Sequence, residues 1–516
     1  MTACLLAGCL GDDEVVSAGA DAGPPPDAVV PAGFPYDDPG DFDRSDCRVS
    51  PALDTVDPVG IFHLDVVFEE FGAFPGVLRV DPVDGGLSAF LFGRRFETVS
   101  HTATDLFVRT ESVNAAGERR VRALLLCAVG DDGGLHGQYA SCRDQDCSLA
   151  EIGAYKVEPI DEPLSANVAL LSEFNGPVSA PWPPASITLN VRHHANTAYV
   201  VRGTDGLRIV DLSDPGAPVE VGHSPVEFQM NEIYNDVKLI DGTDGKPYAI
   251  VASSERAAVA IDVSEPANPV EVSTFPAPPL GVVDGFSVHT LFIDGTRAYL
   301  ANTTRGGLDI FDVSDPPNPV RLGQFVDDRV QTLGGFVHDL YVENGRVYLN
   351  YWNLGMVVLD ALADPDAPAV VGTFDSYNRR TSHSSWATVA GGKKIVVHGD
   401  EDFGAHVRIV DDDPQSASYM EEISSFATRP WVSVHNIMAI GQIALVTYYQ
   451  DGLRVLDLSN PLNPREIGHY HTWPGAVPGY GTGFYEGAIG VDYDVSRELV
   501  YLADTHRGLF VLQLVP

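Results

Sequence analysis

A short sequence motif recurs along the C-terminal part of the chain and restricts its fold more than any other feature. Six segments read apolar-x-apolar-apolar-Asp, and a seventh, "LFVLQ", ends in Gln instead. The motifs end at residues 211, 262, 312, 360, 411, 457 and 513, so consecutive copies lie 46 to 56 residues apart. Self-similarity at a period of this length indicates a protein built from repeated structural units.

Each repeat unit contains the signals for four short strands. In residues 337–374, "VHDLYV" alternates, "ENG" turns, "RVYLNYW" alternates and "LG" turns again. "MVVLD" then predicts a buried strand, "DPDAP" a turn and "AVVGTF" the last strand. Seven such units predict an all-β chain with a seven-bladed β-propeller. A β-sandwich cannot use seven equal four-stranded units, and a β-solenoid repeat is much shorter.

The two ends of the repeat region predict how the ring closes. The last copy stops at "GLFVLQLVP", which is its third strand. Before the first copy, "NVALLSEF" at 167–174 resembles the fourth-strand text "NPVRLGQF" at 318–325. We therefore expect the N-terminal segment to supply the missing strand of the last blade, which leaves the ring without an open edge.

Residues 47–160 precede the propeller, which we place at 165–516, and do not share its repeat. Segments such as "IFHLDVVFEEF" and "RRVRALLLCAV" predict a small β-rich domain, either a barrel or a sandwich, lipocalin-like by analogy only. Its four cysteines allow three disulfide pairings, of which we favour Cys47–Cys127 with Cys142–Cys147. A zinc site is the alternative, but no close CxxC pair supports it. Disulfides indicate an oxidising compartment.

The first 46 residues predict a leader and a tether. "LLAGC", which ends at Cys9, resembles the lipobox of bacterial lipoproteins. That resemblance implies acylation of Cys9, and Leu10 after it suits the outer membrane. The acidic Pro/Gly/Ala-rich stretch that follows has no periodicity and should stay unfolded. We expect a cell-envelope protein, either anchored to the outer membrane or secreted, that meets the membrane only through its lipid, because no apolar run reaches the roughly 18 residues of a membrane helix.

The charge balance excludes some classes of partner. With 72 acidic and 32 basic residues, the formal net charge is −40. A chain of this charge without a Lys/Arg cluster does not bind nucleic acid electrostatically, and it is not attracted to anionic lipid. It does attract cations such as Ca²⁺, and basic partners.

The repeat text also resembles a known family. "GLRIVDLSDPGAPVEVG" and "GLRVLDLSNPLNPREIG" are similar to the LVIVD repeat, and the similarity covers roughly residues 165–516. The resemblance implies a bacterial surface or secreted propeller that acts as a binding module. We expect a monomer with a protein or carbohydrate ligand at the propeller face.

Histidine recurs at the start of the first strand of four consecutive repeats. Aligned on the repeat text, this position holds Leu189, Asp236, His289, His338, His383, His435 and Gly487, with Glu486 beside the last. The first strand of a propeller blade borders the central channel, so these side chains should converge at the channel mouth. Imidazoles with carboxylates suit Zn²⁺, Cu²⁺, Mn²⁺ or iron. The alternative is structural, with each histidine bonded to the backbone of a neighbouring blade.

A second candidate group lies in the fifth repeat, where "VVHGDEDFGAHVRIVD" crowds acidic and imidazole side chains into one hairpin. Its candidates are His398, Glu401, Asp402 and His406. Oxygen-rich loops suit Ca²⁺, although the EF-hand spacing is absent and a solvated acidic hairpin is the alternative.

The sequence assigns no catalytic residue, because neither a GxSxG elbow nor an HExxH motif is present. We therefore favour a binding scaffold, with a metal-dependent enzyme that uses a histidine-lined channel as the alternative.

Overall fold

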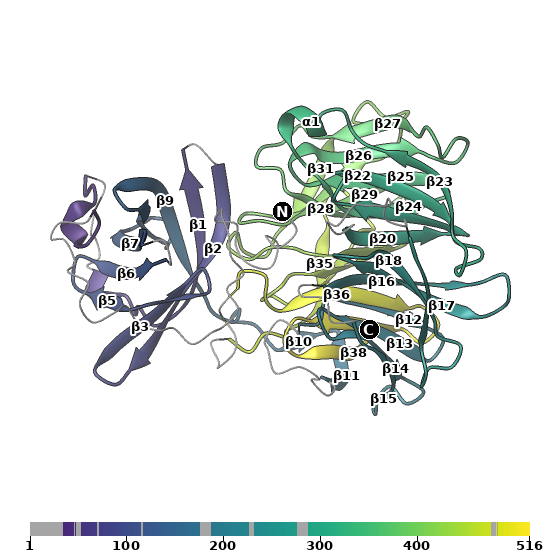
Figure 1. Cartoon of the computed structure of the whole chain (residues 1–516), viewed down its shortest axis with the longest axis horizontal. Helices are drawn as coiled ribbons and strands as arrows, with labels where there is room; N and C mark the ends of the chain where they lie inside the picture. The colour runs from purple at the N-terminus through teal and green to yellow at the C-terminus, as the bar shows by residue number, and fades with distance from the viewer. Residues whose placement is uncertain are drawn as a thin grey trace. The chain divides into compact units, whose positions relative to one another are not determined.

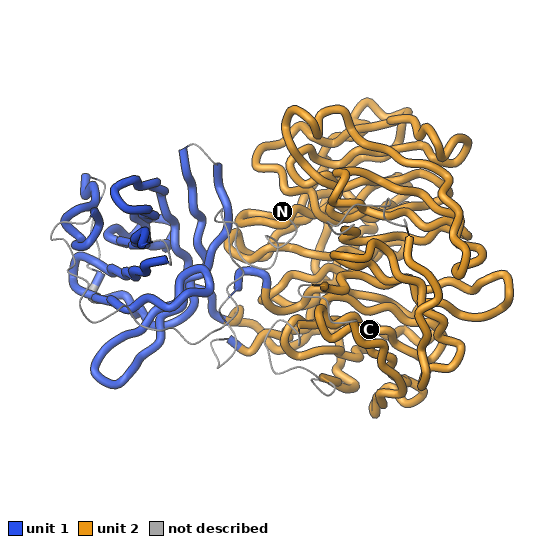
Figure 2. Tube along the Cα trace, in the orientation of Figure 1, with its two compact units in different colours: residues 1, 3–158, 475–485 blue, residues 2, 159–474, 486–516 orange. Residues whose placement is uncertain are grey.

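The computed structural model describes residues 35–45, 47, 53–69, 72–114, 117–175, 187–226, 232–275, 287–475, 481 and 483–515. The chain forms two compact units, one of residues 3–158 with 475–485 and the other of 159–474 with 486–516 (Figure 2). Cys9 and the predicted leader lie outside the described residues. Within the described ranges, no helix is long and apolar enough to span a membrane. The helical segments are all short: η2(Pro39–Asp41), η3(Leu53–Thr55), α1(Val330–Leu333) and η5(Trp352–Leu354).

The first unit is an antiparallel sheet with the strand order β4-β3-β2-β1-β9-β8-β7-β6-β5. β4 and β5 lie at opposite ends of this order, yet only Glu97 separates them in the chain. The sheet must therefore curl until its two edges meet, which makes the unit an up-and-down β-barrel. The strands are β1(Gly60–Phe68), β2(Gly72–Val83), β3(Gly86–Leu91), β4(Arg94–Phe96), β5(Thr98–His101), β6(Leu106–Val113), β7(Arg119–Val129), β8(Leu135–Arg143) and β9(Asp146–Val157).

Alternate residues fill the barrel and two disulfides fasten it. In β1, Phe62, Leu64, Val66 and Phe68 all belong to one buried core, because side chains two apart share a face of a strand. Disulfides join Cys47 to Cys127 and Cys142 to Cys147, the second across the β8–β9 hairpin. The favoured pairing and the small disulfide-containing β-domain are thus confirmed.

The second unit contains seven antiparallel sheets, which confirms the seven-bladed propeller (Figure 1). The first four blades are β12(Asn190–His194) to β15(Val219–Ser224), β16(Tyr234–Asp241) to β19(Val270–Phe275), β20(Val288–Asp294) to β23(Val320–Phe325) and β24(Val337–Glu343) to β27(Ala369–Phe374). Between the first and the last strand of these blades lie β13(Thr197–Arg202), β14(Gly206–Asp211), β17(Pro247–Ser253), β18(Ala257–Asp262), β21(Arg297–Asn302), β22(Gly307–Asp312), β25(Arg346–Tyr351) and β26(Gly355–Asp360).

The last three blades follow the same pattern. They comprise β28(Ser382–Ala390), β29(Lys393–Asp400), β30(Val407–Asp411) and β31(Glu422–Phe426); β32(Ile437–Ile440), β33(Ile443–Thr447), β34(Leu453–Asp457) and β35(Arg465–Tyr470); and β36(Ala488–Asp494), β37(Leu499–Asp504) and β38(Gly508–Leu514). The recurring motif forms the third strand of every blade.

The N-terminal segment closes the ring as the sequence predicts. β11(Val168–Phe174) pairs antiparallel with β38 and completes the last blade. The two residues of β10(Ser165–Ala166) add to β35 at the outer edge of the sixth blade. One chain segment therefore holds two neighbouring blades together.

Adjacent blades meet through one repeated contact between a turn and an outer strand. In several blades the side chain of the Asp that ends the motif accepts a hydrogen bond from the backbone amide two residues later. Asp211 accepts such a bond from Ser213 at 2.9 Å. This bond begins the turn that contains the proline. The Pro carbonyl of that turn then approaches the outer strand of the preceding blade. Ser273 donates to the Pro316 carbonyl at 2.6 Å. At Gly323, a Cβ atom would lie only 1.8 Å from the Pro365 carbonyl oxygen.

Candidate functional site

β-Bulges at the start of the inner strands aim the histidines into the channel. In β24 the register shifts between Val337 and Asp339, and in β28 it shifts between Ser382 and Ser384. His338 and His383 are therefore the extra residues of these bulges. A bulge re-aims a side chain without ending the strand, so both imidazoles turn out of the sheet.

The bulges also give a different alignment for two other blades. In β16 the shift lies between Tyr234 and Asp236, so Asn235 takes the histidine position and Asp236 lies one residue further along. In β36 the shift lies between Ala488 and Gly490, and the position falls on Ile489 instead of Gly487. An ungapped alignment of the repeat text could not detect these shifts.

A second repeated position also contributes to the channel mouth. It lies just after the second strand of a blade, where Trp352 and Glu401 directly follow β25 and β29, and Tyr449 lies two residues after the end of β33. The Glu401 amide donates to the Thr381 carbonyl at 2.9 Å, two residues before His383. This backbone bond ties the hairpin to the start of the inner strand, so that Glu401 reaches the histidines.

Four imidazoles and one carboxylate meet at this place. The Nε2 atoms of His289 and His338 are 2.9 Å apart. Glu401 Oε2 lies 3.5 Å from His383 Nε2 and 3.9 Å from His338 Nε2, and Glu401 Oε1 lies 3.6 Å from His435 Nε2. We call His338, His383, His435 and Glu401 the channel cluster.

Surrounding groups orient the channel cluster. His435 Nδ1 bonds the Ile489 carbonyl at 2.7 Å, which fixes Nδ1 as the protonated nitrogen and leaves the Nε2 lone pair facing Glu401. Tyr449 donates its hydroxyl proton to Glu401 Oε1. The indole of Trp352 lies 5.0 Å from the His338 ring, centroid to centroid.

Burial keeps the cluster uncharged. His338, His383 and Glu401 are 3%, 1% and 4% exposed. Desolvation lowers the pKa of His338 and His383 well below the usual value, and neighbouring imidazoles add to this. It lowers the pKa of His435 to about 3 and raises the pKa of Glu401 to about 8. The imidazoles are neutral at physiological pH, which is the form that binds metal.

The spacing of the cluster suits a tetrahedral metal ion. Ligand atoms about 2.0–2.1 Å from such an ion lie roughly 3.3–3.4 Å from one another. Glu401 Oε2 lies 3.5 Å from His383 Nε2, which is close to that value, and 3.9 Å from His338 Nε2, which is longer. His435 Nε2 faces the other carboxylate oxygen, Oε1, at 3.6 Å. His338, His383 and Glu401 each offer one ligand atom, and these three atoms lie within 4.8 Å of one another. Within the described part of the chain, neither ring nitrogen of the buried His383 makes a hydrogen bond. A buried polar group without a partner fits a site for an ion.

The remaining candidates are placed elsewhere. Glu486 is buried before β36, outside the metal-ligating groups found among the described residues. His398 contacts the Ser382 hydroxyl at 2.9 Å, inside its blade. Asp402 accepts from Arg379 at 3.0 Å, and His406 contacts the Gly404 carbonyl at 3.1 Å. Of the four residues in the acidic hairpin, only Glu401 joins the histidines.

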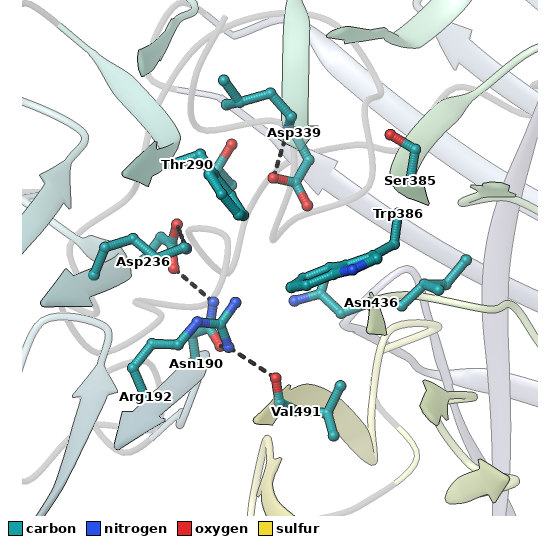
Figure 3. A pocket seen from close by; sticks show the side chains of 13 residues that line it. Asn190, Arg192, Asp236, Thr290, Asp339, Ser385, Trp386, Asn436 and Val491 are labelled. Carbon is teal, nitrogen blue, oxygen red and sulfur yellow. Dashed lines mark hydrogen bonds and ion pairs between the residues drawn. The ribbon is translucent and has the colours of Figure 1, made fainter. Parts of the chain in front are cut away.

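A polar layer lies next to the histidines along the inner strands (Figure 3). Asp236 accepts from Asn190 at 2.6 Å and from the Leu291 amide at 3.1 Å. Asp339, whose pKa burial raises to about 6, faces the same space. The cavity there has a volume of about 30 Å³, which holds water or an ion but no organic ligand.

Another group with metal-ligand chemistry lies in the sixth blade, where Glu162 approaches His469 and His471. Arg454 Nη1 donates to Glu162 at 2.7 Å, and His469 also contacts Glu466 at 2.9 Å. A guanidinium this close opposes a second cation, and the carboxylates already have partners. These contacts fasten the chain segment next to β10 to the sixth blade.

The loops of the fourth and fifth blades also form an open depression on the channel-mouth face. Leu333, Asn353, Tyr377, Asn378, Arg379 and Arg380 line it, and its volume is about 400 Å³. A space of this size accepts a side chain or a sugar unit.

Sequence reasoning found the four histidines and Glu401 but did not connect them, and it missed Tyr449 and Trp352. The signal was available in the repeats. Comparison of the two residues after each second strand, and not only of the first-strand position, finds Trp352, Glu401 and Tyr449.

A seven-bladed β-propeller with a histidine-lined channel defines the class of this protein. Four segments match the LVIVD repeat, at residues 190–224, 245–276, 288–327 and 433–472. The chain is therefore an LVIVD-repeat β-propeller protein, as the repeat text suggested. No curated protein matches it significantly.

Solved structures with a similar arrangement share little sequence with the chain. The computationally designed Ika8 protein is 9% identical with a TM-score of 0.42, covering 80% of this chain and 94% of its own. Raptor from Chaetomium thermophilum is 10% identical with a TM-score of 0.49, covering 67% and 29%. A putative 6-phosphogluconolactonase from Bacteroides fragilis is 14% identical with a TM-score of 0.42, covering 62% and 87%. Likenesses at this level say nothing about what the chain binds.

Proposed function

We propose that this protein is a binding module whose central channel holds one divalent transition-metal ion. The observation that carries the proposal is the channel cluster, in which three imidazoles from consecutive blades face the Glu401 carboxylate at 3.5 to 3.9 Å. Each ligand comes from a different blade or hairpin, so the ion would tie blades four, five and six together.

The ligand set favours zinc over the other metals considered. Three neutral nitrogen donors and one carboxylate suit Zn²⁺, with Cu²⁺ and Fe²⁺ as competitors. Ca²⁺ takes six to eight oxygen ligands, and the cluster offers only the two of Glu401.

The number of ligands favours a structural role of the metal ion over a catalytic one. Catalytic zinc keeps one coordination position for water or substrate, whereas a structural ion has four protein ligands. The channel cluster offers four. His338, His383 and Glu401 are buried and their ligand atoms lie within 4.8 Å of one another, and the partly buried His435 lies 3.6 Å from the second oxygen of Glu401. His289 is not among the ligands. Its Nε2 lies 2.9 Å from His338 Nε2 with one proton between the two nitrogens, so this contact must open when His338 Nε2 coordinates the ion.

Metal analysis of the untagged full chain tests this function. We expect about one zinc ion per chain after dialysis against trace zinc, and loss of that ion in the variant H338A/H383A/H435A. His194→Ala is the matched control, because His194 lies on an exposed hairpin far along the sequence from the cluster. H289A should retain the metal. Retention of zinc by the triple variant would refute the proposal.

We further propose that the protein is exported and anchored through acylated Cys9. Two disulfides in the barrel support an oxidising compartment. Radiolabelled palmitate should label the wild-type protein in its bacterial host. The Cys9→Ser variant should carry no label and should no longer be recovered in the membrane fraction. An unlabelled wild-type chain would count against the anchor.

The depression beside Arg379 and Arg380 is our candidate for the site of a protein or carbohydrate ligand. It lies on the channel-mouth face, where loops from two blades meet. A glycan array and a surface pull-down with R379E/R380E as comparison would test it. If the double variant binds the ligand as well as the wild type does, the ligand binds outside the depression.

A further inference from the structure

Three arginines share the inner face of the β-barrel near one end. Arg94 follows the β3–β4 turn and pairs with Leu91, a core residue that points inward. Arg122 lies two residues before the core residue Leu124 on β7, and Arg120 two residues before Arg122. Because alternate residues share a face, all three side chains lie on the inner face of the sheet, at the rim of the barrel, where Arg94 is exposed and Arg120 and Arg122 are half-buried.

These arginines lack the counter-charges that other arginines of the chain have. Arg109 and Arg119, on the outer face of β6 and β7, both pair with Glu111. Within the described residues, no carboxylate oxygen lies within 4.0 Å of a nitrogen of Arg94, Arg120 or Arg122. Desolvation, followed by the like charges of Arg122 and Arg120, lowers the pKa of Arg94. In a chain of net charge −40, such a positive cluster is unusual.

A buried hydroxyl group points to a ligand at the same place. Tyr139 on β8 pairs with Leu124, so it shares the inner face, and it is completely buried. Its hydroxyl makes no hydrogen bond of ordinary geometry with a described residue, although Ser141 and Arg122 lie close enough to act on it, and the Nε atom of Arg120 is buried without a partner. The guanidinium groups of Arg122 and Arg94 act on the Tyr139 hydroxyl electrostatically, which places them near it.

Aromatic rings cover the core beneath the arginines. The Phe92 ring lies 5.4 Å from the Tyr139 ring in an edge-on arrangement, and Phe74 lies 6.3 Å from Phe92. Below them the barrel is packed with core side chains, which leave no room for a long hydrocarbon chain.

We propose that this end of the barrel is an oxyanion site, at which Arg94, Arg120, Arg122 and the Tyr139 hydroxyl bind a phosphate, sulfate or carboxylate group. Guanidinium groups bind such groups through paired, charge-assisted hydrogen bonds. The anion would supply the missing counter-charge and satisfy the unpaired donors. The site belongs to the barrel and does not depend on the metal proposed for the propeller.

Calorimetric titration of the full chain tests the site, with inorganic phosphate, sulfate and benzoate as separate probes in a chloride buffer of constant ionic strength. We expect one saturable site. Tighter binding of phosphate or sulfate would identify an inorganic or phosphorylated ligand, and tighter binding of benzoate a carboxylate on an aromatic body. Both R94Q and R122Q should weaken binding at least about tenfold, because each loses a charge-assisted bond. Y139F should weaken it a few-fold.

Arg95→Gln is the matched control, because Arg95 is an equally exposed neighbour of Arg94 but lies on the opposite face of β4. The arginine variants should fold without ligand at least as well as the wild type, since each removes like-charge repulsion, and circular dichroism checks this. Absence of saturable binding by the wild type would overturn the proposal. Equal losses in R95Q and R94Q would also overturn it.

Discussion

Burial decides what each histidine of this chain can do. His194 is half exposed on a hairpin, whereas His338 and His383 are enclosed by neighbouring rings. Desolvation removes the proton from the enclosed imidazoles and leaves lone pairs without hydrogen-bond donors. The same residue type is therefore a solvated surface group in one blade and a metal-ligand candidate in others.

Tyr449 should act on the metal through Glu401. Its hydroxyl donates to Glu401 Oε1, and bonds of this kind orient a ligating carboxylate. We expect Tyr449→Phe to lower zinc affinity about tenfold while the stoichiometry remains one. Competition with a chromophoric chelator measures this. Tyr493→Phe, on the last blade, is the control and should have no effect; equal effects of both variants would contradict the assigned role of Tyr449.

The buried imidazoles should make the metal-free propeller sensitive to acid. Desolvation, followed by the charge of Arg408, lowers the pKa of His398 well below 6.5. Below pH 6.5 the unfolded chain therefore binds a proton that the folded chain does not, so stability falls as the pH falls. Glu401 and Asp339 act in the opposite direction, because their raised pKa values let the folded state hold protons.

Substitution of His398 isolates one contribution to this effect. Each such histidine adds up to about 1.4 kcal/mol of lost stability per pH unit below 6.5. The His398→Asn variant should show a shallower fall in unfolding free energy between pH 6.5 and 5, measured by urea titration in EDTA. A slope equal to that of the wild type would contradict the buried neutral state of His398.

The sequence was enough to predict that the histidines converge at the central channel, but not that β-bulges shift the register of the strands that carry them. Recurrence in the repeat text was enough to bring His289, His338, His383 and His435 to the channel. The one-residue offset at Asp236 arises from backbone register, which residue types do not encode visibly. The contact between Glu401 and the histidines depends on a hairpin bond, and that bond is clear only when strands are paired.

At the scale of the element, two kinds of contact join the turn of one blade to the outer strand of the preceding blade. At five junctions a proline carbonyl from the turn of one blade approaches the outer strand of the blade before it. Ser172, Ser273 and Ser424 donate a hydroxyl proton to that carbonyl, whereas Gly222 and Gly323 let it approach the bare backbone. Glycine and serine alternate at the three junctions between blades one and four, as Gly222, Ser273 and Gly323. The strand order and these turns were predictable, because the repeat text contains both.

Substitutions at these two kinds of junction should differ in cost. Gly323→Ala places a Cβ atom against the Pro365 carbonyl and should destabilise the propeller by about 1–3 kcal/mol through overpacking. Ser273→Ala loses one neutral hydrogen bond and should cost about 0.5–1.5 kcal/mol. Chemical denaturation measures both. Gly86→Ala, where no atom lies within 4 Å of the added Cβ, is the control. A harmless Gly323→Ala would contradict the close approach.

The barrel shows where prediction from the sequence stops. Alternation in "IFHLDVVF" predicted strands, but barrel and sandwich remained equal alternatives. The barrel closes because β4 pairs with β3 at one end of the sheet and β5 pairs with β6 at the other end, while only Glu97 separates β4 from β5 in the chain. Such long-range pairing has no local signal in this chain, and no repeat reveals it.

At the scale of the whole molecule, ring closure makes the propeller dependent on a strand from before its first blade. Val168 is 2% exposed in β11, where it packs in the core shared by the last two blades. Val168→Asp buries an unpaired charge and should destabilise the propeller by about 3–5 kcal/mol. Leu170→Asp, at a position 42% exposed in the same strand, should change stability by less than about 1 kcal/mol. Calorimetry would show the difference, and a tolerated Val168→Asp would refute closure by β11.

The central claim is that blades four, five and six together hold one metal ion in the channel. Anomalous diffraction at the zinc absorption edge, from crystals of the full chain grown with stoichiometric zinc, tests it most directly. The account predicts one dominant peak about 2.0–2.2 Å from ligand atoms of His338, His383, His435 and Glu401. A dominant peak between Glu162, His469 and His471, or no peak in the channel, would contradict it.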